Sequence, residues 1–119
     1  VTVFRGKPVT KFSFQMNDQE KEKVLQSHNQ FMRELSSYCK KEDTNLLVLD
    51  EVIGACGTNL LDENLLIDFL KNKPAHLEVV MTGRNPSPEL LELADYVSEI
   101  CKRRHPFDKG IAAREGIEK

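Results

Sequence analysis

The chain has 119 residues, of which 39% are hydrophobic, 30% charged and 7% aromatic. This is the composition of one globular domain, and it excludes wholesale disorder and collagen-like repeats. Its 17 Lys and Arg against 19 Asp and Glu give a net charge of −2, so we expect no nucleic-acid or anionic-membrane partner. No apolar run approaches the roughly 20 residues of a membrane-spanning helix.

The three cysteines, Cys39, Cys56 and Cys101, show no CxxC spacing. We therefore expect three small buried hydrophobic residues, no zinc site or disulfide framework, and a cytoplasmic location where thiols stay reduced. The chain begins with Val1 and has no signal-peptide pattern. We expect a fragment, a processed chain or a trimmed version of a longer protein.

The first half of the chain predicts extended structure followed by a long helix. Residues 1–16 are rich in Val, Thr and Phe, which indicates a short strand, a turn at 6–8 and an extended segment. Asn17 or Asp18 can cap a helix from about 18 to 41. Its apolar side repeats at helical spacing and contains Val24, Leu25, His28, Phe31, Met32, Leu35, Tyr38 and Cys39.

The second half alternates strands with helices. The run LLVL at 46–49 has no polar alternation, which is typical of a strand covered on both faces. We expect four further elements after it: a helix at about 62–72 capped by Asp62, a strand at 77–82, a helix from Ser87–Pro88 to about 95, and a last strand at 96–102. A helical turn is expected near 109–115. This order indicates one α/β domain, 1–119, built on a parallel sheet.

Ligands of such sheets bind at the carboxyl ends of the strands. The sequence LLVLDE at 46–51 has the Walker B pattern, in which Asp50 holds Mg²⁺ directly or through water and Glu51 orients water or shares the metal. The alternative is a solvated strand end. After the next strand, TGRN at 82–85 supplies Gly83 for a tight turn and Arg84 to clamp a phosphate, unless Arg84 is only a surface cation.

Two other groups of residues have alternatives that the motifs leave open. Phe12 and Phe14, in KFSF, either pack in the core or cover a flat ligand. His105 and Asp108 flank an aromatic residue in a turn and are either ligand contacts or solvated side chains. The chain contains no GxxxxGK(S/T), GxSxG, HExxH or GxGxxG pattern. The motifs alone therefore do not choose between nucleotide binding and no specific function.

Taken together, three stretches resemble one family. They are NLLVLDEV at 45–52, ENLLIDFLKNKPAHLEVVMTGRNPSPELLELADYVSEI at 63–100 and KRRHPFDKGIAAREGIE at 102–118. Their order and spacing are similar to the P-loop ATP:corrinoid (cob(I)alamin) adenosyltransferases. The resemblance implies a RecA-like P-loop nucleotidase sheet, parallel with helices on both faces, and commonly a homodimer. It implies transfer of the 5′-deoxyadenosyl group of ATP to Co(I) of a corrinoid, with release of triphosphate.

The resemblance also implies the cofactors and the site. These are ATP, Mg²⁺ and a corrinoid, with a flavoprotein as a reductant partner. No catalytic Ser, Cys or His is implied, because the nucleophile belongs to the corrinoid. By the match, Asp50 and Glu51 fall at the Mg²⁺ site, and Thr82, Gly83 and Arg84 fall at the phosphates. Phe12 and Phe14 fall near the lower face of the corrinoid. His105 and Asp108 fall at further contacts from a loop.

Two departures from the family pattern matter. Phe14 stands where the family usually has Trp, so the aromatic wall fills less volume. The N-terminal βαβ part with its P-loop has no counterpart in these 119 residues. We therefore expect this chain to be inactive alone, and unstable or self-associating because apolar strand edges and faces are exposed. A degenerate, non-catalytic family member that acts as a binding module, and a fragment of another P-loop ATPase, remain alternatives.

Overall fold

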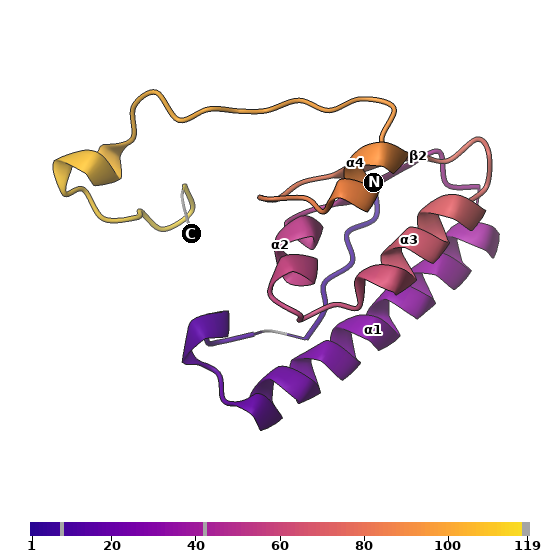
Figure 1. Cartoon of the computed structure of the whole chain (residues 1–119), viewed down its shortest axis with the longest axis horizontal. Helices are drawn as coiled ribbons and strands as arrows, with labels where there is room; N and C mark the ends of the chain where they lie inside the picture. The colour runs from indigo at the N-terminus through magenta and orange to yellow at the C-terminus, as the bar shows by residue number, and fades with distance from the viewer. Residues whose placement is uncertain (8, 42, 118–119) are drawn as a thin grey trace.

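The computed structural model of the protein describes residues 1–7, 9–41 and 43–117. Short helices and two strands follow one long helix, and α1 and α3 lie side by side (Figure 1). The elements are η1 (Ser13–Gln15), α1 (Asp18–Lys41), β1 (Leu46–Leu49), α2 (Val52–Gly57), α3 (Glu63–Asn72), β2 (Glu78–Met81), α4 (Pro88–Leu93) and η2 (Pro106–Lys109).

The two strands form a parallel pair. Leu46 lies opposite Glu78 and Leu49 opposite Met81. Parallel neighbours require a crossover connection, which here consists of α2 and α3. The expected parallel α/β arrangement is confirmed for these two strands, and their carboxyl ends lie together at one edge of the sheet.

Local capping fixes the helix boundaries as the sequence predicts. The Asp62 carboxylate accepts a hydrogen bond from the Asn64 amide at 3.0 Å and begins α3. The Ser87 hydroxyl accepts from the Leu90 amide at 3.2 Å, and Pro88 occupies the first turn of α4. These side chains satisfy amides that have no partner within the first turn of a helix. The predicted helices at 18–41, 62–72 and 87–95 are thus confirmed.

Two predicted strands and one predicted helical turn are wrong. Residues 1–7 and 9–16 form no strand; the turn expected at 6–8 includes Pro8, outside the described residues. Residues 96–102 form no strand either, and the turn of helix lies at 106–109 instead of 109–115. Beyond α4 the chain runs away from the sheet (Figure 1). A strand gains its hydrogen bonds only from a neighbour, so an extended pattern without one stays irregular.

The core lies on one face of the strand pair. The inward-facing Leu47, Val79 and Met81 pack against residues from all four α-helices, with Leu66 and Leu77 fully buried. The core contains Met32, Leu35, Cys39, Leu49, Val52, Cys56, Leu61, Leu66, Ile67, Phe69, Leu77 and Leu90. Cys39 and Cys56 are buried as predicted, whereas the prediction for Cys101 is wrong because it is exposed.

The other face of the sheet is open in the described part of the chain. Leu46, Val48 and Val80 point away from the core and are 58%, 56% and 46% exposed; we call them the open sheet face. The expectation of helices on both faces is therefore wrong for the described residues, in which every helix that reaches the core packs on the opposite face. The described residues include no helix that is long and apolar enough to cross a membrane.

The open sheet face should make the chain self-associate. It joins three apolar side chains on strands that each have one neighbour among the described residues, and such surfaces drive association. We expect a concentration-dependent increase in mass by analytical ultracentrifugation. Val48→Lys should reduce it, whereas Lys23→Ala, on the solvent side of α1, should not. A monodisperse monomer at high concentration would contradict the prediction.

Candidate functional site

A hydrogen-bond chain joins the carboxyl ends of β1 and β2. The Thr82 hydroxyl donates to Oδ1 of Asp50 at 2.7 Å and accepts from the backbone amide of Glu51 at 2.8 Å. The Thr82 amide also donates to the Leu49 carbonyl at 3.1 Å, which extends the ladder between the strands. Both acids predicted from the Walker B pattern are exposed at this edge.

The backbone around this edge is specialised. Glu51 adopts the left-handed conformation, with φ of 54°, and is the N-cap residue of α2. Gly83 has φ of 144°, and a Cβ there would lie 2.6 Å from Cβ of Ile53 and 2.9 Å from the Gly54 amide nitrogen. The structure assigns no hydrogen-bonded turn at Gly83, but a bend follows at residues 84–85. Glycine is required at position 83 by this close approach to the start of α2 and by the backbone angle.

Arg84 follows Gly83, lies in the bend and is exposed. Its guanidinium makes no ion pair or hydrogen bond with any residue that the structure describes. Asp50, Glu51, Thr82, Gly83 and Arg84 thus lie at one edge of the sheet, and we call them the strand-end site. A guanidinium that is exposed and unpaired among the described residues is available to bind a phosphate bidentately.

The strand-end site offers oxygen ligands to a cation. Mg²⁺ is usually held in proteins by one or two carboxylates, with phosphate oxygens and water completing its octahedron. Asp50 and Glu51 fit this requirement. The described residues contain no group of three or more His, Cys, Asp or Glu that could hold a metal by themselves. Most ligands of a cation here would therefore come from a phosphate-bearing substrate and water.

The two predicted corrinoid contacts form an exposed aromatic pair. The rings of Phe12 and Phe14 stack with centroids 5.5 Å apart and an interplanar angle of 5°. They are 70% and 79% exposed, so in the described structure they do not pack in the core. Of the two interpretations left open by the sequence, core packing is therefore not seen in the described structure, and the role of the pair as a cover for a flat ligand stays a prediction.

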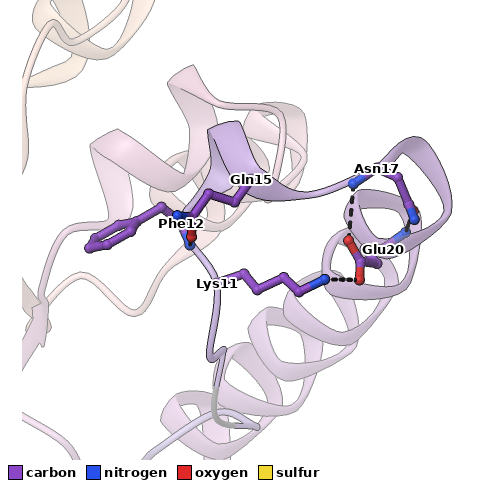
Figure 2. A network of polar contacts seen from close by, with 5 residues as sticks. All are labelled: Lys11, Phe12, Gln15, Asn17 and Glu20. Atoms are coloured by element: carbon purple, nitrogen blue, oxygen red, sulfur yellow. Dashed lines mark hydrogen bonds and ion pairs between the residues drawn. The ribbon is translucent and has the colours of Figure 1, made fainter.

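A polar network joins the aromatic pair to the start of α1 (Figure 2). Lys11 forms an ion pair with Glu20, and the Phe12 amide donates to Oε1 of Gln15 at 3.2 Å. Asn17 and Glu20 exchange hydrogen bonds: the Glu20 amide donates to Asn17 Oδ1 at 2.8 Å, and the Asn17 amide donates to Glu20 Oε2 at 3.0 Å. This is a capping box, so Asn17 is the N-cap residue. The spacing N-x-x-E was the available sequence signal for Glu20.

This network should be sensitive to acid. The hydrogen bond from Lys11 and the hydrogen bond with the Asn17 backbone lower the pKa of Glu20 below its ordinary 4.5. A depressed folded-state pKa means that the contribution to stability is present above 4.5 and is lost as pH falls through the folded-state value. We expect the Asn17 amide to lose protection from exchange as the pH falls below 4.5, through the lowered pKa of Glu20.

Glu20→Gln provides the control for that titration. Its amide oxygen still accepts from the Asn17 amide, but it carries no charge, so its protection should not change over the same range. Amide hydrogen exchange followed by NMR checks both chains. Equal pH dependence in the wild type and in Glu20→Gln would contradict the assignment.

The predicted loop contacts have local roles. The His105 Nδ1 accepts from the Phe107 amide at 3.1 Å and caps η2. Asp108 pairs with Lys102 at 2.8 Å. Both lie in the segment that runs away from the sheet (Figure 1), so the structure does not bring them to the strand-end site.

Two other features of the structure, a buried thiol and a shallow hollow, are not part of the strand-end site. Burial, with smaller contributions from Glu63 and Asp62, raises the pKa of the Cys56 thiol to about 11, so this thiol stays protonated and is a poor nucleophile. A shallow hollow of about 420 Å³ is lined by residues of α1 and α3, including Arg33 and Asp68. None of the strand-end residues lines it.

The two parallel strands end at the same edge of the sheet, where two acids, a threonine and an arginine follow them. This arrangement is that of an α/β protein with a candidate cation and phosphate site at the sheet edge. Comparison with known proteins gives the family. The family model described as ATP:corrinoid adenosyltransferase BtuR/CobO/CobP matches residues 1–118, and the chain belongs to this family.

Individual relatives agree with this assignment. A corrinoid adenosyltransferase of Sinorhizobium is 38% identical over 80 residues, which are 66% of this chain and 37% of the relative. The corrinoid adenosyltransferase of Pseudomonas aeruginosa is 37% identical over 76 residues, 64% of this chain and 37% of the relative. The corrinoid adenosyltransferase CobA of Salmonella typhimurium is 36% identical over 74 residues, which are 62% of this chain and 38% of the relative. The alignments therefore span well under half the length of these relatives.

Proposed function

We propose that this chain contributes the cation and phosphate edge, and one wall of the corrinoid site, to an ATP:corrinoid adenosyltransferase. The reaction would transfer the 5′-deoxyadenosyl group of ATP to the Co(I) centre of a corrinoid and release triphosphate. The observation that carries the proposal is the coupling of Asp50 to Thr82 across the two strand ends, in a chain that the family model matches over residues 1–118.

The roles follow from the chemistry of each side chain. Asp50 and Glu51 would hold Mg²⁺, whose positive charge offsets the charge of the triphosphate when it is bound. Arg84 would bind phosphate oxygens through its planar guanidinium. These residues orient the leaving group and stabilise its charge, and no protein nucleophile is required because the corrinoid supplies the attacking atom.

The aromatic pair would bind the second substrate. Phe12 and Phe14 present parallel, exposed rings, and apolar side chains against the lower face of a corrinoid would keep polar ligands away from cobalt. Such a wall favours the less coordinated cobalt, which is easier to reduce to the nucleophilic state. A reductant flavoprotein and a second copy of the chain are further partners in this proposal.

Calorimetric titration of Mg²⁺-ATP into the chain tests the nucleotide part. We expect weak binding that needs Mg²⁺, is lost in Asp50→Ala and persists in Asp68→Ala, which removes the same charge from the exposed side of α3. With cob(II)alamin as the ligand, Phe12→Ala and Phe14→Ala should lose the heat and Asp50→Ala should keep it. Equal heats in Asp50→Ala and the wild type would overturn the assignment of the site.

The same titrations separate the proposal from its alternative. A degenerate family member that serves as a binding module would bind neither Mg²⁺-ATP at Asp50 nor a corrinoid at the aromatic pair. We also expect no adenosylcobalamin from the isolated 119-residue chain, because nothing in it provides the amide-rich loop and lysine of a P-loop.

A further inference from the structure

The three polar groups of Thr82 make four hydrogen bonds, all to the segment 49–53. Its amide donates to the Leu49 carbonyl and its carbonyl accepts from the Ile53 amide at 3.2 Å. Its hydroxyl donates to Asp50 and accepts from the Glu51 amide. One residue at the end of β2 thus holds the whole turn that connects β1 to α2.

These bonds limit what Thr82 can do with a phosphate. A hydroxyl has one proton, and here the proton is donated to Asp50 Oδ1 at 2.7 Å. The remaining lone pair can face a cation, but it repels the oxygen of a phosphate. The family resemblance places Thr82 at the phosphates, but a role of its hydroxyl as a direct donor to a phosphate conflicts with this geometry.

The same bonds have a clear consequence for Asp50. An exposed aspartate at a strand end ordinarily samples several side-chain rotamers, and ordering them on binding costs free energy. The Thr82 hydroxyl fixes one carboxylate oxygen and leaves Oδ2 with its lone pairs available. Because threonine is branched at Cβ, its own χ1 angle is stiff, so it is a rigid support.

Gly83 and Glu51 support this arrangement. The absent Cβ of Gly83 allows the end of β2 to approach Ile53 and Gly54 closely, and the left-handed backbone of Glu51 turns its amide toward the Thr82 hydroxyl. The hydroxyl therefore joins the side chain of one acid to the backbone of the next.

We propose that Thr82 is a positioning residue that pre-orients the Asp50 carboxylate for the cation of a nucleotide–metal substrate, and that it does not itself bind the phosphates. The proposal rests on the proposed function for the identity of the substrate, but the orientation of Asp50 is a property of the chain without ligand. It can therefore be measured separately.

The test uses isotope-labelled wild-type, Thr82→Val and Thr82→Ser chains without ligand. Three-bond couplings to the Asp50 carboxyl carbon report its χ1 rotamer, and hydrogen exchange reports the Glu51 amide. We expect one rotamer in the wild type and in Thr82→Ser, which keeps the hydroxyl. Thr82→Val should show averaged couplings and an about tenfold faster exchange of the Glu51 amide. Thr58→Val, which removes a hydroxyl bonded to the Gly54 carbonyl, should leave the Asp50 couplings unchanged.

Averaged couplings in the wild type, or unchanged couplings in a folded Thr82→Val chain, would overturn the proposal. The wild-type measurement can therefore overturn the proposal even if Thr82→Val does not fold. Adding Mg²⁺-ATP then tests the proposed function and the positioning role of Thr82 separately. With a fixed Asp50, an absence of binding contradicts the proposed function and leaves the positioning intact. Binding that is equal in the wild type and Thr82→Val contradicts the positioning role, which predicts about tenfold weaker binding in the variant.

Discussion

Replacing Leu66 by alanine is expected to lower the free energy of unfolding by about 2–5 kcal/mol, the range for large-to-small substitutions in a packed core. Leu66 is fully buried in the middle of α3, between the long helix and the inner face of the strands. Since small domains are stable by only about 5–15 kcal/mol, this loss removes a large share of the free energy of unfolding. Urea denaturation followed by circular dichroism measures it.

Leu91→Ala is the matched control for this substitution. Leu91 lies next to the buried Leu90 on α4 but is 42% exposed, so the same truncation should cost less than about 1 kcal/mol. Similar losses for Leu66→Ala and Leu91→Ala would mean that the core does not lie where the structure has it.

Gly83→Ala should both destabilise the chain and distort the strand-end site. The new methyl group would lie 2.6 Å from Cβ of Ile53 and 2.9 Å from the Gly54 amide nitrogen, at φ of 144°. A strained backbone costs about 1–3 kcal/mol and overpacking about the same, so we expect a loss of about 2–5 kcal/mol. Amide NMR shifts should change most at Asp50, Glu51 and Thr82.

Gly57→Ala provides the comparison. Gly57 ends α2 with an ordinary backbone angle, and a Cβ added there would meet open space, so alanine should be neutral or slightly stabilising. If Gly83→Ala costs no more than Gly57→Ala, the close approach of the β2 end to α2 is not a feature of the folded chain.

The sequence predicted best those elements that carry their own local signals. The long helix and α3 show apolar spacing and a capping side chain, and β1 is a continuous apolar run that ends in Asp50. The site residues at the ends of both strands follow from the rule that parallel strands end at the same edge. Hence Asp50 and Thr82 were expected near each other, and the structure joins them by a hydrogen bond.

The missed elements depend on partners or on unusual backbone. Residues 52–57 form α2 although two glycines lower the helix propensity of this short segment. Residues 96–102 have a strand composition, yet they form no strand, because pairing requires a neighbour that a sequence pattern does not specify. The orientation of Thr82 toward Asp50 and of Gly83 toward Ile53 depends on packing between distant segments, which no local motif encodes.

A cation bound with ATP at the strand-end site is the feature on which the proposed function depends. Mn²⁺ in place of Mg²⁺ tests it most directly, because the paramagnetic ion broadens the NMR signals of nearby amides. With Mn²⁺-ATP at low occupancy, we expect the amides of Glu51, Thr82 and Gly83 to broaden first and Asp50→Ala to abolish this effect. Broadening that begins at acidic residues elsewhere, or that persists unchanged in Asp50→Ala, would contradict a cation site at this edge.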